Sequence, residues 1–248
     1  MILITKNKEP KEWTEYRNTP GVDYQAIPEL VQSLLKEQGY ICAYCMRRIP
    51  KQDKLYKKDR KNYVLTQEDH RVEHMKCREL HDDLKLEYRN MVICCPGHIG
   101  EDDHCDRLKG AKDISFTPLD QQFIDTIKYN SDGTIISTNE LYNTEINDIL
   151  NLNTKLLKVN RKAMLNQVIF QINVACKKGK SWDKKTLKFY LKKYSEKHFE
   201  EDEEEVKEKY YSYCGIVTWF IQKKLRTLGT FIKYYKISQL IHTQIIAN

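Results

Sequence analysis

Two cysteine pairs constrain the folding of this chain more than any other feature of its sequence. Cys42 and Cys45 stand in the segment CAYC, with the two-residue gap that lets both thiolates reach one zinc ion. Cys95 and Cys105 form a second pair with a longer gap. We expect a zinc ion bound by all four sulfurs to hold together a small motif that lacks a large core of its own.

The second pair leaves alternatives open. Cys94 and Cys95 are adjacent, so only one of them can point at the metal; we choose Cys95 and interpret Cys94 as a small buried side chain. A thioredoxin-like redox pair also uses the CAYC spacing, but it needs a helix starting at the first cysteine within a βαβ pattern, and none follows. Three other residues remain alternative zinc ligands: Cys77, His98 and His104.

Composition and charge indicate a cytoplasmic protein. No apolar stretch approaches the ~18 residues of a membrane span, and no signal peptide is visible at the start of the chain. In a reducing compartment the eight cysteines indicate metal ligands and buried thiols instead of disulfides. The net charge of +7 permits a polyanionic partner without requiring one.

Local patterns predict an α+β fold. A helix is expected from Ile27, with Pro28 in its first turn and Gly39 at its end. The pair Asp132-Gly133 predicts the turn of a β-hairpin. Strands are further expected at 2–5, in YICAYC (40–45), in YVLTQEDHRVEHM (63–75) and in YRNMVICC (88–95), and a short helix in CDRLKG (105–110).

Three segments differ in composition. Residues 1–40 form an N-terminal strand and helix segment, and residues 41–112 contain most of the cysteines and histidines. Residues 113–248 combine the hairpin with a mainly α-helical body that we expect to bind a partner. Within this body, the six acids at 200–205 predict an exposed linker or helix end, with a contact for a basic partner as the alternative.

Polar residues enclosed by the cysteines indicate phosphodiester hydrolysis. This reaction needs a base that deprotonates water and a divalent cation that holds the phosphate and the leaving oxygen. His74 can be the base, and Glu73 and Asp106 can be the two protein ligands of Mg²⁺ or Mn²⁺, because hard cations prefer oxygen. Asn90 can brace the loop that carries His74.

Strand geometry leaves the first cation ligand open. Neighbouring residues of a strand point to opposite faces, so Glu73 and His74 can face one site only if the strand bends or ends there. Asp69 or His70 is the alternative ligand in place of Glu73. For phosphate contacts we expect five basic residues, Lys57, Lys58, Arg60, Lys61 and Lys109, with a solvated loop as the alternative for the first four.

The segments CAYC, VEHM, YRNMVICC and HCDRLKG together resemble the ββα-metal core of an HNH endonuclease with a zinc-binding cysteine quartet. EQGYICAYCMRRI, YNSDGTIIS and LNLNTKLLKVNR also resemble the HNH nuclease subunit of Septu-type and retron-associated anti-phage systems, the PtuB-like family. The resemblance covers about residues 1–165. It implies a partner ATPase of the PtuA-like ABC/AAA type and, in retron systems, a reverse transcriptase with its RNA–DNA hybrid.

Carried over residue by residue, the resemblance makes His74 the general base and Glu73 the acidic metal ligand before it. It makes Asn90 the middle asparagine and Asp106 the last metal ligand, where the motif often has His or Asn. A proline commonly follows the base in this motif, but residues 75–77 contain none. The zinc set implied by the resemblance is Cys42, Cys45, Cys95 and Cys105.

Two functions from different classes follow. The first is a metal-dependent HNH endonuclease that cleaves DNA or RNA, tRNA included, as the effector of an anti-phage complex. The alternative is a non-catalytic zinc-ribbon adaptor that binds nucleic acid or the ATPase. A structural subunit that binds zinc only in order to fold is a third, weaker option.

Overall fold

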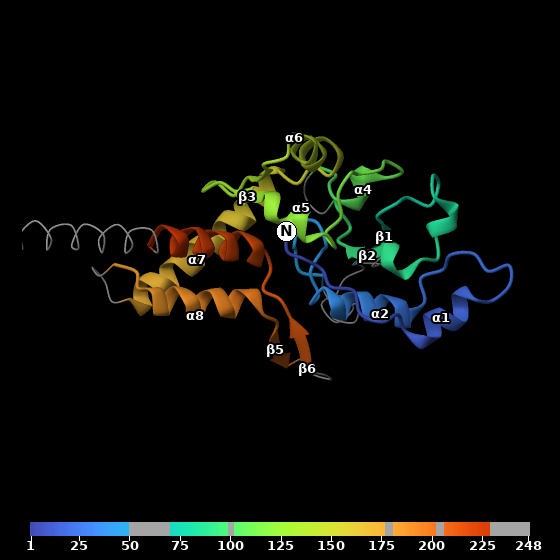
Figure 1. The fold of residues 1–248 in the computed structure, drawn as a ribbon, viewed down its shortest axis with the longest axis horizontal. Coiled ribbons are helices and arrows are strands. Elements are labelled where there is room, and N and C mark those ends of the chain that lie inside the picture. Colours follow the sequence, from blue (N-terminus) through green and yellow to red (C-terminus); the bar gives the residue numbers. More distant parts are fainter. Residues whose placement is uncertain (50–69, 99–101, 177–180, 202–205, 229–248) are drawn as a thin grey trace, which may run out of the picture.

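The computed structural model describes residues 1–49, 70–98, 102–176, 181–201 and 206–228, which form an α+β fold (Figure 1). No helix within these ranges combines the length and the apolar composition that a membrane crossing needs. In chain order the elements are α1 (Lys11–Arg17), α2 (Pro28–Glu37), β1 (Arg71–His74), β2 (Met91–Cys94), α4 (Asp106–Lys109), α5 (Gln121–Thr126), β3 (Ile127–Tyr129), β4 (Ile135–Ser137), α6 (Glu140–Thr144), a π-helical turn (Glu145–Ile149), α7 (Lys155–Ala175), α8 (Lys184–Ser195), β5 (His198–Glu201), β6 (Val206–Lys209) and a helix over 214–228.

Each described sheet is a two-stranded antiparallel hairpin. In β1–β2, Arg71 lies opposite Cys94 and His74 lies opposite Met91, so β1 ends directly after His74. The β3–β4 hairpin has its turn at Asp132-Gly133, where Gly133 adopts φ +92°. The sequence prediction of this hairpin is therefore confirmed, because the turn needs a residue that tolerates positive φ.

Helix α2 also forms where the sequence predicted it. Pro28 occupies its first turn, and Leu30 and Leu34 are fully buried on one face. Gly39 follows the helix with φ +55°, and a Cβ at this position would lie 2.6 Å from the ring of Tyr210. Only glycine fits here, because both the backbone conformation and the close approach of Tyr210 exclude a side chain.

Two predicted strands are absent from the described chain. In the segment 2–5, the N–H of Ile4 donates to the carbonyl oxygen of Pro118 at 2.9 Å, but Pro118 has no N–H with which to continue a ladder. In YICAYC, only Ile41 forms a bridge, with Arg48. The chain reverses directly after Ile41, since the N–H of Met46 donates to the carbonyl oxygen of Cys42 at 3.0 Å.

The acidic run at 200–205 starts in a strand, whereas we predicted a linker or a helix end. Glu200 lies opposite Lys207 in the β5–β6 hairpin, and the Lys209 ammonium lies 3.0 Å from the Glu200 carboxylate. Opposite charges on the facing strand make this acidic segment compatible with a sheet. Residues 202–205 lie outside the described part of the chain.

One hydrophobic core runs through all three segments predicted from composition, 1–40, 41–112 and 113–248. Its buried members range from Met1 and Trp13 to Ile221. Backbone hydrogen bonds also join the segments: the N–H of Tyr213 donates to the carbonyl oxygen of Met46 at 3.0 Å. The segments therefore stabilise one another instead of forming separate cores.

Arg161 on α7 joins the β3–β4 turn to the helical body. Its side chain is buried and donates to the carbonyl oxygens of Gly133 at 2.6 Å and Leu152 at 2.7 Å, and to Oδ1 of Asn153 at 3.1 Å. Nε donates to one acceptor and Nη2 to the other two, an arrangement suited to the planar guanidinium.

We predict that Arg161→Met lowers the free energy of unfolding by ~2–4 kcal/mol, because three buried acceptors lose a charged donor. Urea denaturation of the full chain measures the change. The control is Lys162→Met on the adjacent, exposed position, which should stay within ~0.5 kcal/mol of the parent. Equal losses in the two variants would contradict the role given to Arg161.

Candidate functional site

The four predicted zinc ligands meet at one point. The sulfurs of Cys42, Cys45, Cys95 and Cys105 are buried and all lie within 4.8 Å of one another. The sulfur of Cys45 lies 3.6 Å from that of Cys95, and the sulfur of Cys105 lies 3.9 Å from those of Cys42 and Cys95. Four sulfurs arranged tetrahedrally at ~2.3 Å from zinc would be ~3.8 Å apart. The quartet can therefore hold a zinc ion.

Protonation of the thiols also fits a cation site. Burial raises the pKa of Cys105 well above its usual value, and its hydrogen bond with Cys42 adds to the shift. Burial acts on Cys42 as well, but hydrogen bonds from the neighbouring thiols bring the pKa of Cys42 well below its usual value. The quartet thus favours a single thiolate until a cation offsets the repulsion among further negative sulfurs.

The turn that carries the second pair depends on close backbone contacts. Gly97 has φ +75°, and a Cβ there would lie 2.3 Å from the carbonyl oxygen of His104. The N–H of Cys105 donates to the carbonyl oxygen of Leu150 at 2.8 Å. The helical body therefore helps to hold the sulfur of Cys105 in place.

The alternative zinc ligands lie outside the quartet. Cys94 is buried but does not belong to the cluster, and Cys77 and His98 contact backbone carbonyl oxygens instead. His104 comes nearest, because its Nδ1 lies 3.0 Å from the sulfur of Cys105. An imidazole in this position orients a ligand sulfur instead of binding the metal itself.

A cleft of about 470 Å³ brings three predicted site residues together. Glu73 and His74 line it from the end of β1, and Asp106 lines it from the first position of α4. Glu73 and His74 are neighbours at the end of β1, yet both line this cleft. The structure therefore brings the two side chains to one site despite the alternation of strand faces.

Alternation along β1 identifies Glu73 as the residue that faces Asp106. Arg71 shares a strand face with Glu73, and its Nε lies 2.8 Å from Oδ2 of Asp106. Asp106 acts on the Glu73 carboxyl as well, because both line the cleft and Asp106 contributes to the raised pKa of Glu73. His70 does not line the cleft, and Asp69 lies outside the described residues.

The Glu73 carboxyl is buried and has three polar partners. Oε1 accepts a hydrogen bond from the Tyr44 hydroxyl at 2.9 Å and lies 2.9 Å from the ammonium of Lys109. Burial, and then the neighbouring Asp106 carboxyl, raise the pKa of Glu73 well above its usual range, while Lys109 acts in the opposite direction. A cation bound beside Glu73 would act in the same direction as Lys109 and favour its carboxylate form.

The His74 imidazole is neutral and oriented. Its Nε2 lies 3.0 Å from the carbonyl oxygen of Lys85 and must carry the proton, because a carbonyl only accepts. Nδ1 is then the nitrogen with the free lone pair. Burial lowers the pKa of His74 to about 4, so the ring accepts no proton in its resting state at neutral pH.

Asn90 holds the chain that follows His74. Its Oδ1 accepts from the N–H of Lys76 at 2.8 Å, and its Nδ2 donates to the carbonyl oxygens of Lys76 at 2.9 Å and Leu84 at 3.2 Å. These bonds fix the turn between β1 and the segment before β2. This is the bracing arrangement expected of the amide.

Of the five basic residues predicted to contact phosphate, only Lys109 lies within the described part of the chain. Lys57, Lys58, Arg60 and Lys61 lie outside the described residues. Lys109 is described, but its side chain is fully buried between Oε1 of Glu73 and the carbonyl oxygen of His74, at 2.9 and 3.2 Å. In this position Lys109 holds Glu73 and does not reach a phosphate, because no part of its ammonium is open to a ligand.

Three residues of this region did not enter the sequence prediction. Tyr44 stands between the two cysteines of CAYC, a position that could have drawn notice to it. Arg71 shares the strand face of Glu73, which the alternation along the strand could have indicated. Tyr24, about fifty residues away in sequence, packs its ring edge-to-face on His74 with 4.5 Å between centroids, and no local pattern indicates it.

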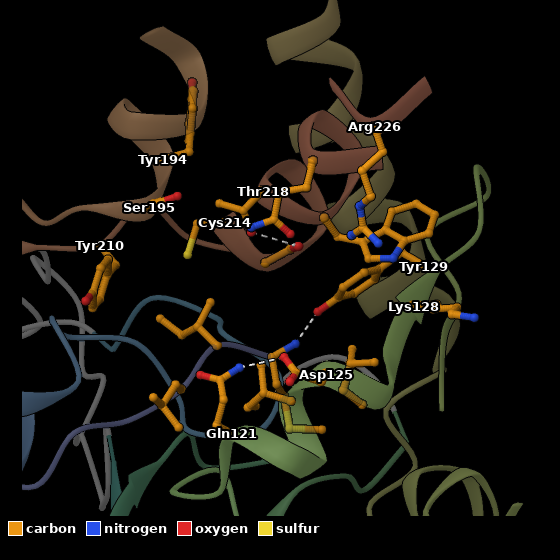
Figure 2. Close-up of a pocket in the computed structure, with 18 residues that line it drawn as sticks. Gln121, Asp125, Lys128, Tyr129, Tyr194, Ser195, Tyr210, Cys214, Thr218 and Arg226 are labelled. Atoms are coloured by element: carbon orange, nitrogen blue, oxygen red, sulfur yellow. Dashed lines mark hydrogen bonds between the residues drawn. The ribbon is translucent and has the colours of Figure 1, made fainter. Parts of the chain in front are cut away.

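A second hollow, of about 440 Å³, lies beside the helix over 214–228 (Figure 2). Its wall includes Met1, Tyr129, Cys214 and Arg226, and the buried amino group of Met1 bonds to the Tyr129 hydroxyl. None of the predicted site residues within the described chain lines it. The chemistry predicted from the sequence therefore belongs to the cleft beside β1.

Comparison of the chain with protein-family models and with curated proteins found no match.

We predict that Cys45→Ser loses the bound zinc and unfolds at least residues 41–112, because three sulfurs cannot complete the tetrahedral site. Elemental analysis and circular dichroism of the purified full chain measure both effects. The matched controls are Cys94→Ala and Cys176→Ser, buried cysteines outside the quartet, which should each retain one equivalent of zinc. A metal-free Cys45→Ser variant with the parent's stability would refute the site.

We further predict that Asn90→Ala lowers the free energy of unfolding by ~2–3 kcal/mol, since the N–H of Lys76 and two carbonyl oxygens lose their partner. Thermal and urea denaturation measure the loss. Asn166→Ala, on an exposed position of α7, should change stability by less than ~0.5 kcal/mol. A similarly small change in Asn90→Ala would show that the amide does not brace the turn.

Proposed function

We propose that the protein is a metal-dependent HNH endonuclease that hydrolyses phosphodiester bonds of nucleic acids. The observation that carries the proposal is the meeting of Glu73, His74 and Asp106 in one cleft. Glu73 and His74 lie on β1 and Asp106 on α4, and the order of β1, β2 and α4 along the chain is compatible with a ββα-metal core. The adjacent sulfur quartet is suited to a structural zinc ion.

His74 is the general base of the proposed reaction. Its Nε2 proton is held by the carbonyl oxygen of Lys85, so the lone pair of Nδ1 can accept a proton from the attacking water. Asn90 fixes the turn after His74 through three hydrogen bonds. Orientation of the base before substrate arrives is what such bracing contributes to catalysis.

Glu73 and Asp106 are the proposed protein ligands of the catalytic cation, Mg²⁺ or Mn²⁺. When bound, such a cation stabilises negative charge on the phosphate and the leaving oxygen. Two carboxyls that line one cleft fit a hard cation that keeps several of its waters. Tyr44 and Lys109 hold one oxygen of Glu73 and thereby orient the other.

The resemblance to the PtuB-like family supports a role as the effector of an anti-phage complex with a PtuA-like ATPase and, in a retron, with a reverse transcriptase and its hybrid nucleic acid. DNA and RNA, tRNA included, are both candidate substrates, because the same attack by water serves either. Exposed apolar side chains on the helical body support a partner surface there: Val159, Phe170 and Val174 of α7 and Phe189 of α8. We expect the resting complex to inhibit the nuclease, since unrestrained cleavage would harm the cell.

One observation favours a second candidate, the non-catalytic zinc-ribbon adaptor. Both carboxyls of the cleft have a basic partner: Lys109 lies 2.9 Å from Glu73, and Arg71 lies 2.8 Å from Asp106. Such pairs neutralise two carboxylates without any divalent cation. In that case, the two ion pairs would only stabilise the fold, and the protein would bind nucleic acid or the ATPase without cleaving.

We predict that His74→Ala lowers metal-dependent cleavage ~10²–10⁴-fold, the contribution of a general base, and leaves zinc content and thermal unfolding close to the parent's. The assay incubates the purified complex with mixed DNA and tRNA in Mg²⁺ or Mn²⁺. Product lengths on a denaturing gel identify the substrate class.

The matched control is His198→Ala, because His198 lies on β5, stacks on Tyr211 and does not line the cleft. It should cleave at the parent's rate. Full activity in His74→Ala would eliminate this residue as the base. Absence of metal-dependent cleavage in every preparation, the parent included, would support the adaptor instead.

A further inference from the structure

One aromatic ring contacts both the proposed base and an arginine at the cleft. Tyr24 lies in the connection between α1 and α2 and meets the His74 ring edge-to-face, with centroids 4.5 Å apart. The guanidinium carbon of Arg78 lies 4.7 Å from the centroid of the same Tyr24 ring. Tyr24 is itself held by an edge contact with the buried Trp13 of α1. The ring therefore ties the N-terminal helices to the cleft.

Arg78 differs from the other basic residues that line the cleft. Arg71 pairs with Asp106, Lys85 pairs with two aspartates, and Arg107 pairs with Asp103. Of the basic residues that line the cleft within the described chain, Arg78 alone has no carboxylate at ion-pair distance. Arg78 is also exposed to solvent. Its guanidinium donors remain open to a ligand, since a ring face accepts the cation's charge but does not use all five N–H groups.

The turn that carries Arg78 is fixed at both ends. The N–H of His81 donates to the carbonyl oxygen of Cys77 at 2.9 Å, which closes the turn. The sulfur of Cys77 donates to the carbonyl oxygen of Ala111 at 3.1 Å, and Nε2 of His81 lies 2.7 Å from Asp113. An arginine on a braced turn loses less freedom on binding than one on a free loop.

We propose that Arg78 binds a backbone phosphate of the nucleic-acid substrate, and that Tyr24 is a positioning residue that holds Arg78 and His74 in a fixed relation. The assignment rests on the proposed nuclease function. Guanidinium groups bind phosphate through two parallel hydrogen bonds, so a fixed Arg78 also fixes the strand relative to the base. The Tyr24 ring, and not its hydroxyl, supplies both contacts.

The test measures binding without cleavage. Fluorescence anisotropy records the Kd of the full chain for labelled single-stranded 20-mers of DNA and of RNA, over a series of KCl concentrations and without added Mg²⁺. Arg78→Ala should raise Kd ~10-fold and reduce the slope of log Kd against log salt by ~0.7, one phosphate contact on a single strand. The DNA and RNA arms show which backbone the contact accepts.

The matched control is Arg89→Ala, which removes the same charge from an exposed site that does not line the cleft. It should shift Kd less than ~2-fold and leave the salt slope unchanged. Equal effects of the two substitutions, or no binding by the parent to either 20-mer, would overturn the assignment of Arg78.

Tyr24 is tested by paired substitutions. Tyr24→Phe keeps the ring and should match the parent in Kd and in cleavage rate. Tyr24→Leu should raise Kd as Arg78→Ala does and also lower kcat, because His74 loses its packing partner. Loss of function in both variants, or in neither, would contradict the positioning role of the ring.

The outcomes also separate this inference from the function on which it rests. If Arg78→Ala binds more weakly and the parent does not cleave, the proposed phosphate contact stands and the proposed nuclease function is refuted. If the parent cleaves and Arg78→Ala binds with the parent's Kd, the proposed nuclease function stands and the proposed phosphate contact is refuted.

Discussion

The sulfur quartet is the constraint on which the geometry of the cleft depends. The CAYC turn places Tyr44 between two of the ligands, and its hydroxyl holds Glu73 at 2.9 Å. Cys105 directly precedes Asp106, which opens α4. Two groups that shape the cleft are thus joined to ligands through the chain itself. Displacement of the sulfurs would move both, so metal binding and the arrangement of the carboxyls are one structural event.

The quartet in turn relies on the helical body. The N–H of Cys105 donates to the carbonyl oxygen of Leu150, and the N–H of Tyr213 donates to that of Met46, beside the CAYC turn. Both bonds join segments that a reading by composition would place in separate domains. The buried core extends from Met1 to Ile221 and includes the four cysteines, so the quartet is embedded in the protein and not appended to it.

The charged groups at the cleft are of two kinds: buried ion pairs and an exposed arginine. Glu73 and Lys109 are both buried, and each compensates the other's loss of hydration. Arg78 stands exposed at the wall against the Tyr24 ring. Buried pairs stay in one geometry because separation is costly, whereas an exposed guanidinium can exchange water for a ligand's phosphate. This division separates the groups that maintain the site from those available to bind.

The sequence by itself determined which cysteines form the sulfur quartet, helix α2 and the turn at Gly133, because cysteine spacing, helical periodicity and turn residues are visible in the chain itself. It also located Glu73, His74 and Asp106, but not which groups would contact them. Only the tertiary structure decided the burial of Lys109, the contact of Tyr24 with His74 and the loss of the expected strand at 2–5. These features depend on which distant segments meet in the core, and no local pattern of residues encodes that.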